Sequence, residues 1–217
     1  MMKLKHYKSR ILSIAIAAMA LFSASAVAAS PSGAPNAHQI LERTTSKIGK
    51  ARCITASFSM TANGHTAKGT LKMSGDKFFL TLPNASIWYD GRTLWSLDSS
   101  TKEVNISEPM PEELAQINPM IIISSLLNAA TPRQMKGTDK DYALHITPKV
   151  SQRLAFTSAM IDVDKKTFLP SRIVLTLDSG QTVTLNTDNI NLTTNHPAST
   201  FVFNKSNYPG YTLIDLR

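Results

Sequence analysis

Two neighbouring stretches alternate apolar and polar residues, and this pattern constrains the fold more than any other feature of the chain. Residues 54–60 alternate Ile, Ala, Phe and Met with Thr and Ser, and residues 66–73 alternate in the same way. A period of two places one set of side chains on one face of a strand. The Asn63-Gly64 pair between the stretches is a signal for a two-residue turn. The sequence therefore predicts an antiparallel hairpin with one apolar face.

Further short strands are expected along most of the chain. Asp90-Gly91 and Ser179-Gly180 mark two more hairpin turns, and the apolar segments 201–203 and 212–214 finish the chain. Many short strands joined by regular turns are typical of an antiparallel sheet that curls into a barrel or a sandwich. The strands that we expect cover residues 78–82, 87–89, 93–97, 104–106, 142–147, 154–163, 168–177 and 181–192.

Helical signals occur at the start of this pattern and in its middle. Asn36 can cap a helix whose apolar face includes Ile40, Leu41 and Ile48, and Gly49 can end that helix. In the middle, residues 111–114 combine a proline with acidic residues, and Asn118-Pro119 repeats the cap-plus-proline signal. Two short helices are expected there, and the second, over residues 120–127, is apolar around most of its circumference.

The first residues read as an export signal. Four cationic side chains precede an apolar run over residues 11–22, and small residues follow up to Ala29. This order is typical of a cleaved secretory signal peptide, and the run is shorter than the roughly 20 residues of a membrane span. We therefore expect a signal peptide over residues 1–29, a flexible leader over 30–36 and a single domain over 37–217, located in the periplasm. Without the four cations, Lys3, Lys5, Lys8 and Arg10, the formal net charge falls from +8 to +4, from 19 Lys and Arg against 15 Asp and Glu.

A search for catalytic or metal-binding patterns returns little. The histidines of residues 30–217 are not spaced as metal ligands, and no phosphate-binding loop, dinucleotide-binding motif or nucleophile elbow is present. Cys53 fits a small buried residue better than a nucleophile. Asp162 and Asp164 imitate a carboxylate pair, but the lysines that follow favour a solvated hairpin end. We expect no enzyme activity, no cofactor and no metal. Because the charges are interspersed, we expect no nucleic-acid partner.

The apolar side chains permit two interpretations. One is an ordinary core of helices packed on a sheet; the other is a curved sheet whose apolar face, covered by a helical lid, forms a hydrophobic cavity for a lipid-like ligand. In the second interpretation the lid contains Leu114, Ile117, Met120, Ile121 and Leu126. The cavity would then be lined by Phe58, Met60, Leu71, Met73, Phe78, Leu80, Trp88, Trp95 and Phe156.

Several short motifs resemble the family of the periplasmic lipoprotein carrier LolA. Residues 90–98, Asp-Gly-Arg-Thr-Leu-Trp-Ser-Leu-Asp, are similar to the family's "DGKTLWFYD". Residues 56–60 resemble its "ASFTQ", residues 69–73 its "G-x-L" strand, and Pro119 begins a segment placed like its "P-x-x-L-L". Residues 201–203 resemble its closing "FxF", and residues 208–211 fall where the family has "P-x-G-V". The order and spacing of these motifs hold from about residue 37 to the end.

The resemblance implies a mainly β (α+β) fold, an incomplete antiparallel β-barrel of about eleven strands with a helical lid over a hydrophobic cavity. It also implies a monomeric carrier that binds the acyl chains of lipoproteins and ferries them from the inner to the outer membrane. Its partners would be acylated lipoproteins, an inner-membrane ABC transporter similar to LolCDE, and an acceptor that is either LolB-like or the outer membrane itself. Where relatives have an Arg-Pro pair that helps to latch the lid, this chain has Ser74-Gly75-Asp76-Lys77, so we expect the lid to be held differently or more loosely.

Two other functions stay open from the sequence. One is a LolA-like lipid-sensing or lipoprotein-sensing regulatory domain that uses the same cavity to detect mislocalised lipid-anchored proteins. Such regulators usually carry a second domain and a basic surface for their partner, and we expect neither here. The other is an unrecognised exported hydrolase, which is disfavoured because no nucleophile–base motif is present.

Overall fold

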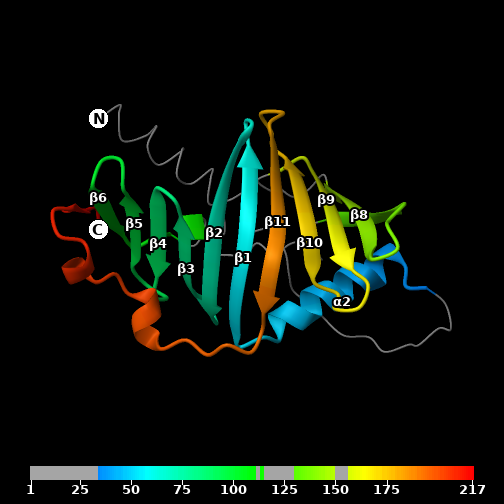
Figure 1. The fold of residues 1–217 in the computed structure, drawn as a ribbon, viewed down its shortest axis with the longest axis horizontal. Helices are drawn as coiled ribbons and strands as arrows, with labels where there is room; N and C mark the ends of the chain where they lie inside the picture. Colours follow the sequence, from blue (N-terminus) through cyan, green and yellow to red (C-terminus); the bar gives the residue numbers. More distant parts are fainter. Residues whose placement is uncertain (1–33, 111–112, 115–129, 150–155) are drawn as a thin grey trace.

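The main element of the computed structural model, which describes residues 34–110, 113–114, 130–149 and 156–217, is a single twelve-stranded sheet. The strand order is β12-β6-β5-β4-β3-β2-β1-β11-β10-β9-β8-β7 (Figure 1). The strands in chain order are β1 (Cys53–Ala62), β2 (His65–Ser74), β3 (Lys77–Leu82), β4 (Ala85–Tyr89), β5 (Leu94–Asp98), β6 (Glu103–Ser107), β7 (Ala130–Met135), β8 (Asp141–Pro148), β9 (Ser158–Asp164), β10 (Pro170–Thr176), β11 (Thr182–Asn191) and β12 (Thr212–Asp215).

The sheet is open, because its edge strands β7 and β12 are not paired with each other. All neighbouring strands are antiparallel except β12, which pairs with β6 in parallel. The expectation of a mainly β, incomplete antiparallel barrel is therefore confirmed, with twelve strands rather than about eleven. Of the expected lid, only Leu114 is described, because residues 115–129 lie outside the described part of the chain.

The helix α2 (Ala37–Gly49) begins and ends where the sequence predicted. Asn36 and Gln39 form a capping box, in which each side chain accepts a hydrogen bond from the other residue's backbone N–H, at 2.9 and 3.0 Å. Ile40, Leu41 and Ile48 are buried along one stripe of the helix. Through this stripe α2 packs against the sheet, next to β7 and across the ends of the neighbouring strands (Figure 1).

The β1–β2 hairpin has the predicted turn. Asn63 and Gly64 both have positive φ, 51° and 76°, as a two-residue hairpin turn of type I′ requires. The turn sets the register of the hairpin, which pairs Ala56 with Leu71. The pairing continues from Leu71 to Leu80 in β3 and from Leu80 to Ile87 in β4. We call the face that carries these four side chains the core face, and the other side the opposite face.

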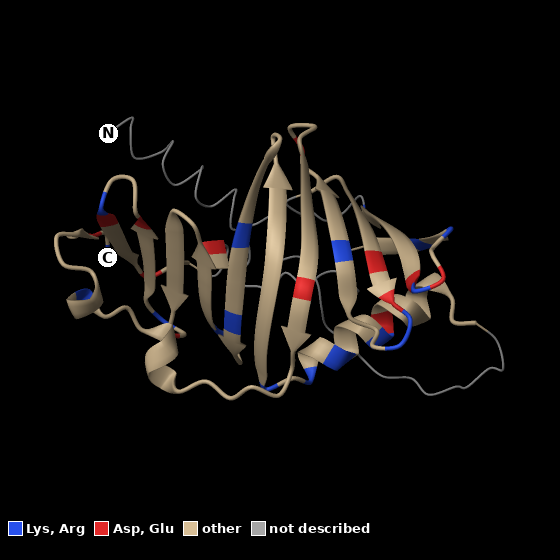
Figure 2. Cartoon of the chain, in the orientation of Figure 1, with Lys and Arg blue, Asp and Glu red and all other residues tan. Residues whose placement is uncertain are grey.

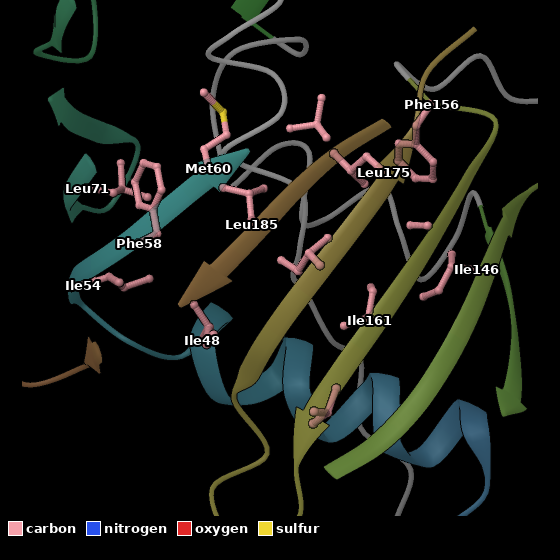
Figure 3. Packing of buried hydrophobic residues seen from close by; sticks show 14 of the residues in the cluster. Ile48, Ile54, Phe58, Met60, Leu71, Ile146, Phe156, Ile161, Leu175 and Leu185 are labelled. Atoms are coloured by element: carbon pink, nitrogen blue, oxygen red, sulfur yellow. The ribbon is translucent and has the colours of Figure 1, made fainter. Parts of the chain in front are cut away.

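Most buried apolar residues lie in one continuous cluster on the core face, which we call the main cluster. It combines 23 buried residues from α2, β1–β4, β7–β11 and Phe156. Figure 3 shows Phe58 next to Leu71, Phe156 next to Leu175, and α2 below the strands. The cluster joins both halves of the chain, so burial of this face accounts for much of the stability that the sheet gains from the hydrophobic effect.

A second, smaller cluster lies on the opposite face and is built around aromatic rings. Trp88, Leu97, Val104 and Phe203 are its buried members, and the residues after β11 supply part of it. The Trp88 ring stacks on Phe79 with centroids 4.8 Å apart and meets Phe203 edge-on at 5.4 Å. This aromatic cluster shows how the last part of the chain, with η1 (Ala198–Phe201), η2 (Lys205–Asn207) and β12, is held on β3–β6.

Three elements differ from the sequence-based expectation. β7 was not predicted, because it has a single buried residue, Ala130, and contains Pro132. β9 begins at Ser158, whereas the sequence predicted a strand from Leu154. Of the two closing apolar segments, only 212–214 forms a strand. Phe201 instead ends the short helix η1 and is buried.

The ring of Phe58 leaves no room for a side chain at Gly69. The two residues are cross-strand partners on the core face, and the Phe58 ring occupies the space that a side chain at Gly69 would fill. A Cβ added to Gly69 would lie 2.4 Å from the nearest ring carbon of Phe58 and 2.9 Å from the carbonyl oxygen of Thr81. Only glycine therefore fits here without displacing the phenylalanine.

We expect Gly69→Ala to lower the free energy of unfolding by about 1–3 kcal/mol, the usual cost of overpacking a well-filled core. Urea denaturation followed by circular dichroism would measure it. The control is the same substitution in a Phe58→Leu background, where the smaller side chain should reduce the cost of Gly69→Ala. An equal cost in both backgrounds would show that Phe58 is not the cause.

Candidate functional site

Seven of the nine side chains predicted to line an apolar cavity lie together in the main cluster. Six come from β1, β2 and β3, the seventh lies two residues before β9, and all belong to the cluster on the core face. Each is less than a tenth exposed, which places them inside the protein rather than on its surface. These residues are Phe58, Met60, Leu71, Met73, Phe78, Leu80 and Phe156.

The other two, Trp88 and Trp95, do not share this surface, and their predicted place was wrong. Trp88 follows Ile87 in β4, and successive residues of a strand point to opposite faces. Trp95 is the cross-strand partner of Trp88, so it lies on the opposite face as well. Both belong to the aromatic cluster. The sequence Ile87-Trp88-Tyr89 already indicated that Trp88 lies on a different face from its neighbours, because three consecutive apolar residues of a strand cannot all face one side.

Of the five predicted lid residues, one is described. Leu114 is half-buried and packs against the main cluster, and its backbone N–H donates to the carbonyl oxygen of Met110 at 2.8 Å. The carboxylate of Glu113 accepts a hydrogen bond from the N–H of Met110, as at a helix start. Ile117, Met120, Ile121 and Leu126 lie outside the described residues.

The main cluster contains no charged side chain. The charged side chains of β2, β3, β9 and β10 point to the opposite face. In Figure 2, the charged segments of β11, β10 and β9 are red, blue and red. There, Arg172 of β10 lies 3.5 Å from the Asp162 carboxylate of β9. On the core face, Tyr89 is a buried member of the main cluster. Burial is the main cause that raises the pKa of Tyr89, and the negative charges of Asp76 and Asp90 raise it further. The Tyr89 side chain therefore stays neutral. The surface suits an uncharged, apolar ligand.

Sequence reasoning missed a group of polar side chains on the opposite face of β1. The Cys53 thiol lies 3.5 Å from the Asn195 amide oxygen and 3.6 Å from the Ser74 hydroxyl. The His196 ring nitrogen Nε2 lies 2.9 Å from the Thr55 hydroxyl. Both contacts tie the segment after β11 to β1. A nucleophilic cysteine would have its histidine as the hydrogen-bond partner, whereas this thiol is buried and contacts an amide and a hydroxyl.

The two aspartates that imitated a catalytic pair have separate structural roles. Asp162 pairs with Arg172, as described above. Asp164 holds a turn, because its carboxylate accepts hydrogen bonds from the backbone N–H groups of Thr167 and Lys166, at 2.7 and 3.0 Å. The N–H of Thr167 is the main reason why the pKa of Asp164 lies below its ordinary value. The hairpin end that the sequence favoured is thereby confirmed.

Within the described part of the chain, no group of three or more His, Cys, Asp or Glu side chains is arranged to hold a metal ion. The helices that the structure describes include none long and apolar enough to cross a membrane.

The fold and the site together define a class of protein: an open antiparallel sheet whose one face carries a continuous, uncharged apolar cluster. The chain belongs to the family described as outer membrane lipoprotein carrier protein LolA, which matches residues 27–181. The resemblance found in the sequence motifs is thereby confirmed. None of the curated protein sequences compared with this chain matches it significantly.

A solved structure of low sequence identity shares the fold. This uncharacterized conserved protein from Thermus thermophilus is 10% identical, with a TM-score of 0.53 over 82% of this chain and 98% of that chain. Two further solved structures are less similar. A putative outer membrane lipoprotein-sorting protein domain from Vibrio parahaemolyticus is 12% identical, with a TM-score of 0.43 over 76% of this chain and 95% of that chain. A LolA superfamily protein from Nitrosomonas europaea is 15% identical, with a TM-score of 0.37 over 78% of this chain and 99% of that chain.

The contacts of Cys53 lead to a prediction about its reactivity. The folded protein should react slowly with a thiol reagent such as DTNB, because the thiol is buried and held by Asn195 and Ser74. Asn195→Ala should raise the labelling rate about fivefold, the effect of one lost hydrogen bond on the opening of this segment. Ser59→Ala, on the same face of β1, is the matched control and should leave the rate unchanged. Equal rates in all three proteins would mean that Asn195 does not hold the segment.

Proposed function

We propose that this protein is a periplasmic carrier that shelters the acyl chains of lipoproteins against the core face and ferries them from the inner to the outer membrane. The single observation that carries the proposal is the continuous, uncharged main cluster on the core face of a LolA-family sheet. The export signal expected in residues 1–29 supports the location, although those residues lie outside the described part of the chain.

The energetics explain why a carrier is needed. Burying one CH₂ group is worth about 0.8 kcal/mol, so a C16 chain that is exposed to water costs on the order of 12 kcal/mol. A lipoprotein with several such chains does not cross an aqueous compartment without a protein that covers them. The carrier must also release its cargo, so its affinity for acyl chains has to stay reversible.

Competition between the protein's own side chains and the ligand offers a way to moderate the affinity. Met60 and Met73 are buried in the main cluster, and methionine is unbranched and adapts to irregular spaces. In the proposed mechanism such side chains fill the acyl-binding space in the free protein and shift when a chain enters. Ligand binding then exchanges one set of apolar contacts for another, and the net gain is smaller than the transfer energy of the chain alone. Binding and release of the acyl chain form and break no covalent bond.

The partners follow from this role. The donor would be an inner-membrane ABC transporter similar to LolCDE, and the acceptor a LolB-like protein or the outer membrane itself. The cargo would be recognised by its acyl chains rather than by its protein part. A monomer is sufficient for this work, because one core face forms the proposed site.

A photo-crosslinking amino acid at two neighbouring positions of β1 tests the site. Phe58 lies on the core face and is 3% exposed, whereas Ser57 points to the opposite face. We expect a crosslinker at position 58 to capture an acylated lipoprotein, and the same crosslinker at position 57 to capture none. Immunoblotting against a known lipoprotein, together with mass spectrometry of the adducts, would identify the cargo.

The outcomes of this experiment separate the alternatives. Equal capture at both positions would contradict the core face as the binding surface. Capture of free lipids without lipoproteins at position 58 would contradict the carrier role and leave a lipid-binding protein of another kind.

A further inference from the structure

The buried stripe of α2 contains two neighbouring threonines among its apolar residues. Thr44 lies one helical turn after Ile40 and one turn before Ile48, so the three side chains share the face that packs on the main cluster. Thr44 and Thr45 are both fully buried, with 0% exposure. They are the polar residues at the centre of an otherwise apolar contact.

The two hydroxyls differ in their hydrogen bonding. The Thr45 hydroxyl donates to the carbonyl oxygen of Leu41 at 2.8 Å, one turn earlier, which satisfies it within the helix. The Thr44 hydroxyl makes no such bond. It is the one buried side-chain polar atom, among the residues that the structure describes, without a hydrogen-bond partner. Buried polar groups in folded proteins are nearly always paired, so this hydroxyl calls for an explanation.

The stability of the free protein does not explain why residue 44 carries a hydroxyl group. Valine has the same shape and would replace the hydroxyl with a methyl group, which the apolar surroundings favour. A hydroxyl that faces the acyl-binding surface becomes useful when a hydrogen-bond acceptor enters that surface. The linkages of acyl chains, esters and amides, carry a carbonyl oxygen, which is a neutral acceptor. An anionic headgroup is a poor candidate, because the main cluster contains only uncharged side chains and a buried unpaired charge is costly.

We propose that the Thr44 hydroxyl donates a hydrogen bond to the ester or amide carbonyl oxygen of a bound acyl chain. The site would then select acyl groups over plain hydrocarbon and fix the depth at which the linkage lies. This assignment rests on the proposed function, since it deepens the same site. Thr44 would act as a specificity-determining residue, and the surrounding apolar side chains would supply most of the affinity.

Two glycerol lipids that differ in the carbonyl group alone test the assignment. The probes are 1,2-dioctanoylglycerol, with two ester carbonyls, and its ether analogue 1,2-dioctylglycerol. Their affinities would be measured with the purified protein by displacement of the neutral dye N-phenyl-1-naphthylamine. We expect the unmodified protein to prefer the ester by about fivefold, the effect of one net hydrogen bond. Thr44→Val should abolish the preference and leave the affinity for the ether unchanged.

Three further variants and measurements distinguish a binding role from a structural one. Thr44→Ser keeps a hydroxyl and should keep the preference. Thr45→Val is the matched control, because it removes a hydroxyl that is already satisfied by Leu41, and it should keep the preference as well. In urea denaturation, Thr44→Val should unfold at a higher midpoint than the unmodified protein, and Thr45→Val at a lower one.

Three outcomes would contradict either the assignment of Thr44 or the proposed function. Equal affinity of the unmodified protein for ester and ether would overturn the assignment and leave the proposed function standing, with a buried water as the partner of Thr44. A preference that survives in Thr44→Val would overturn it too. If neither lipid displaced the dye, the proposed function itself would fail.

Discussion

The pairing of β1 with β11 is the interaction on which the rest of the structure depends. It joins two antiparallel meanders, β1–β6 and β7–β11, which would otherwise be separate sheets. The partners are far apart in the sequence, as the pair Met60 and Leu185 illustrates, so their alignment has a high entropic cost that local hairpins do not have. A register shift between Ser57 and Phe58 lies within this pairing. Such irregularities bend a strand and increase its twist, which suits a sheet that curls without closing.

Once the two meanders are joined, their apolar faces form a single surface that α2 helps to cover. A surface of this size stabilises the fold, and in the proposed function it also takes up an apolar ligand, so the two roles would compete. Tight packing, as between Phe58 and Gly69, favours the first role. Unsatisfied or adaptable groups, such as the Thr44 hydroxyl and the side chain of Met60, favour the second. In the proposed function, the two interpretations that the sequence left open, core and binding surface, would therefore describe the same residues.

Elements with strong local signals could be predicted from the sequence, and elements that depend on distant partners could not. The capping residue Asn36 and the Asn63-Gly64 turn act within a few residues, so the helix and the first hairpin were predicted where they occur. β7 escaped prediction because proline is tolerated on an edge strand but is a signal against strands elsewhere. Most of the predicted cavity residues follow from a period of two. Trp88 was misplaced, because strand alternation assigns it to the face opposite its neighbour Ile87.

The aromatic cluster suggests how this sheet can use one face for binding without losing stability. Phe203 and Tyr208, whose ring centroids are 5.3 Å apart, both form T-shaped contacts with Trp88, with centroid distances of 5.4 and 5.6 Å. These contacts hold the end of the chain on β4. At this end the sheet edge is β12, a strand of only four residues, and short edge strands lower the risk of association through the edge. Ring contacts of this kind contribute beyond the area that they bury. Because β3–β6 are stabilised from the opposite face, we infer that contacts on their core face can rearrange around a ligand while the strands keep their register.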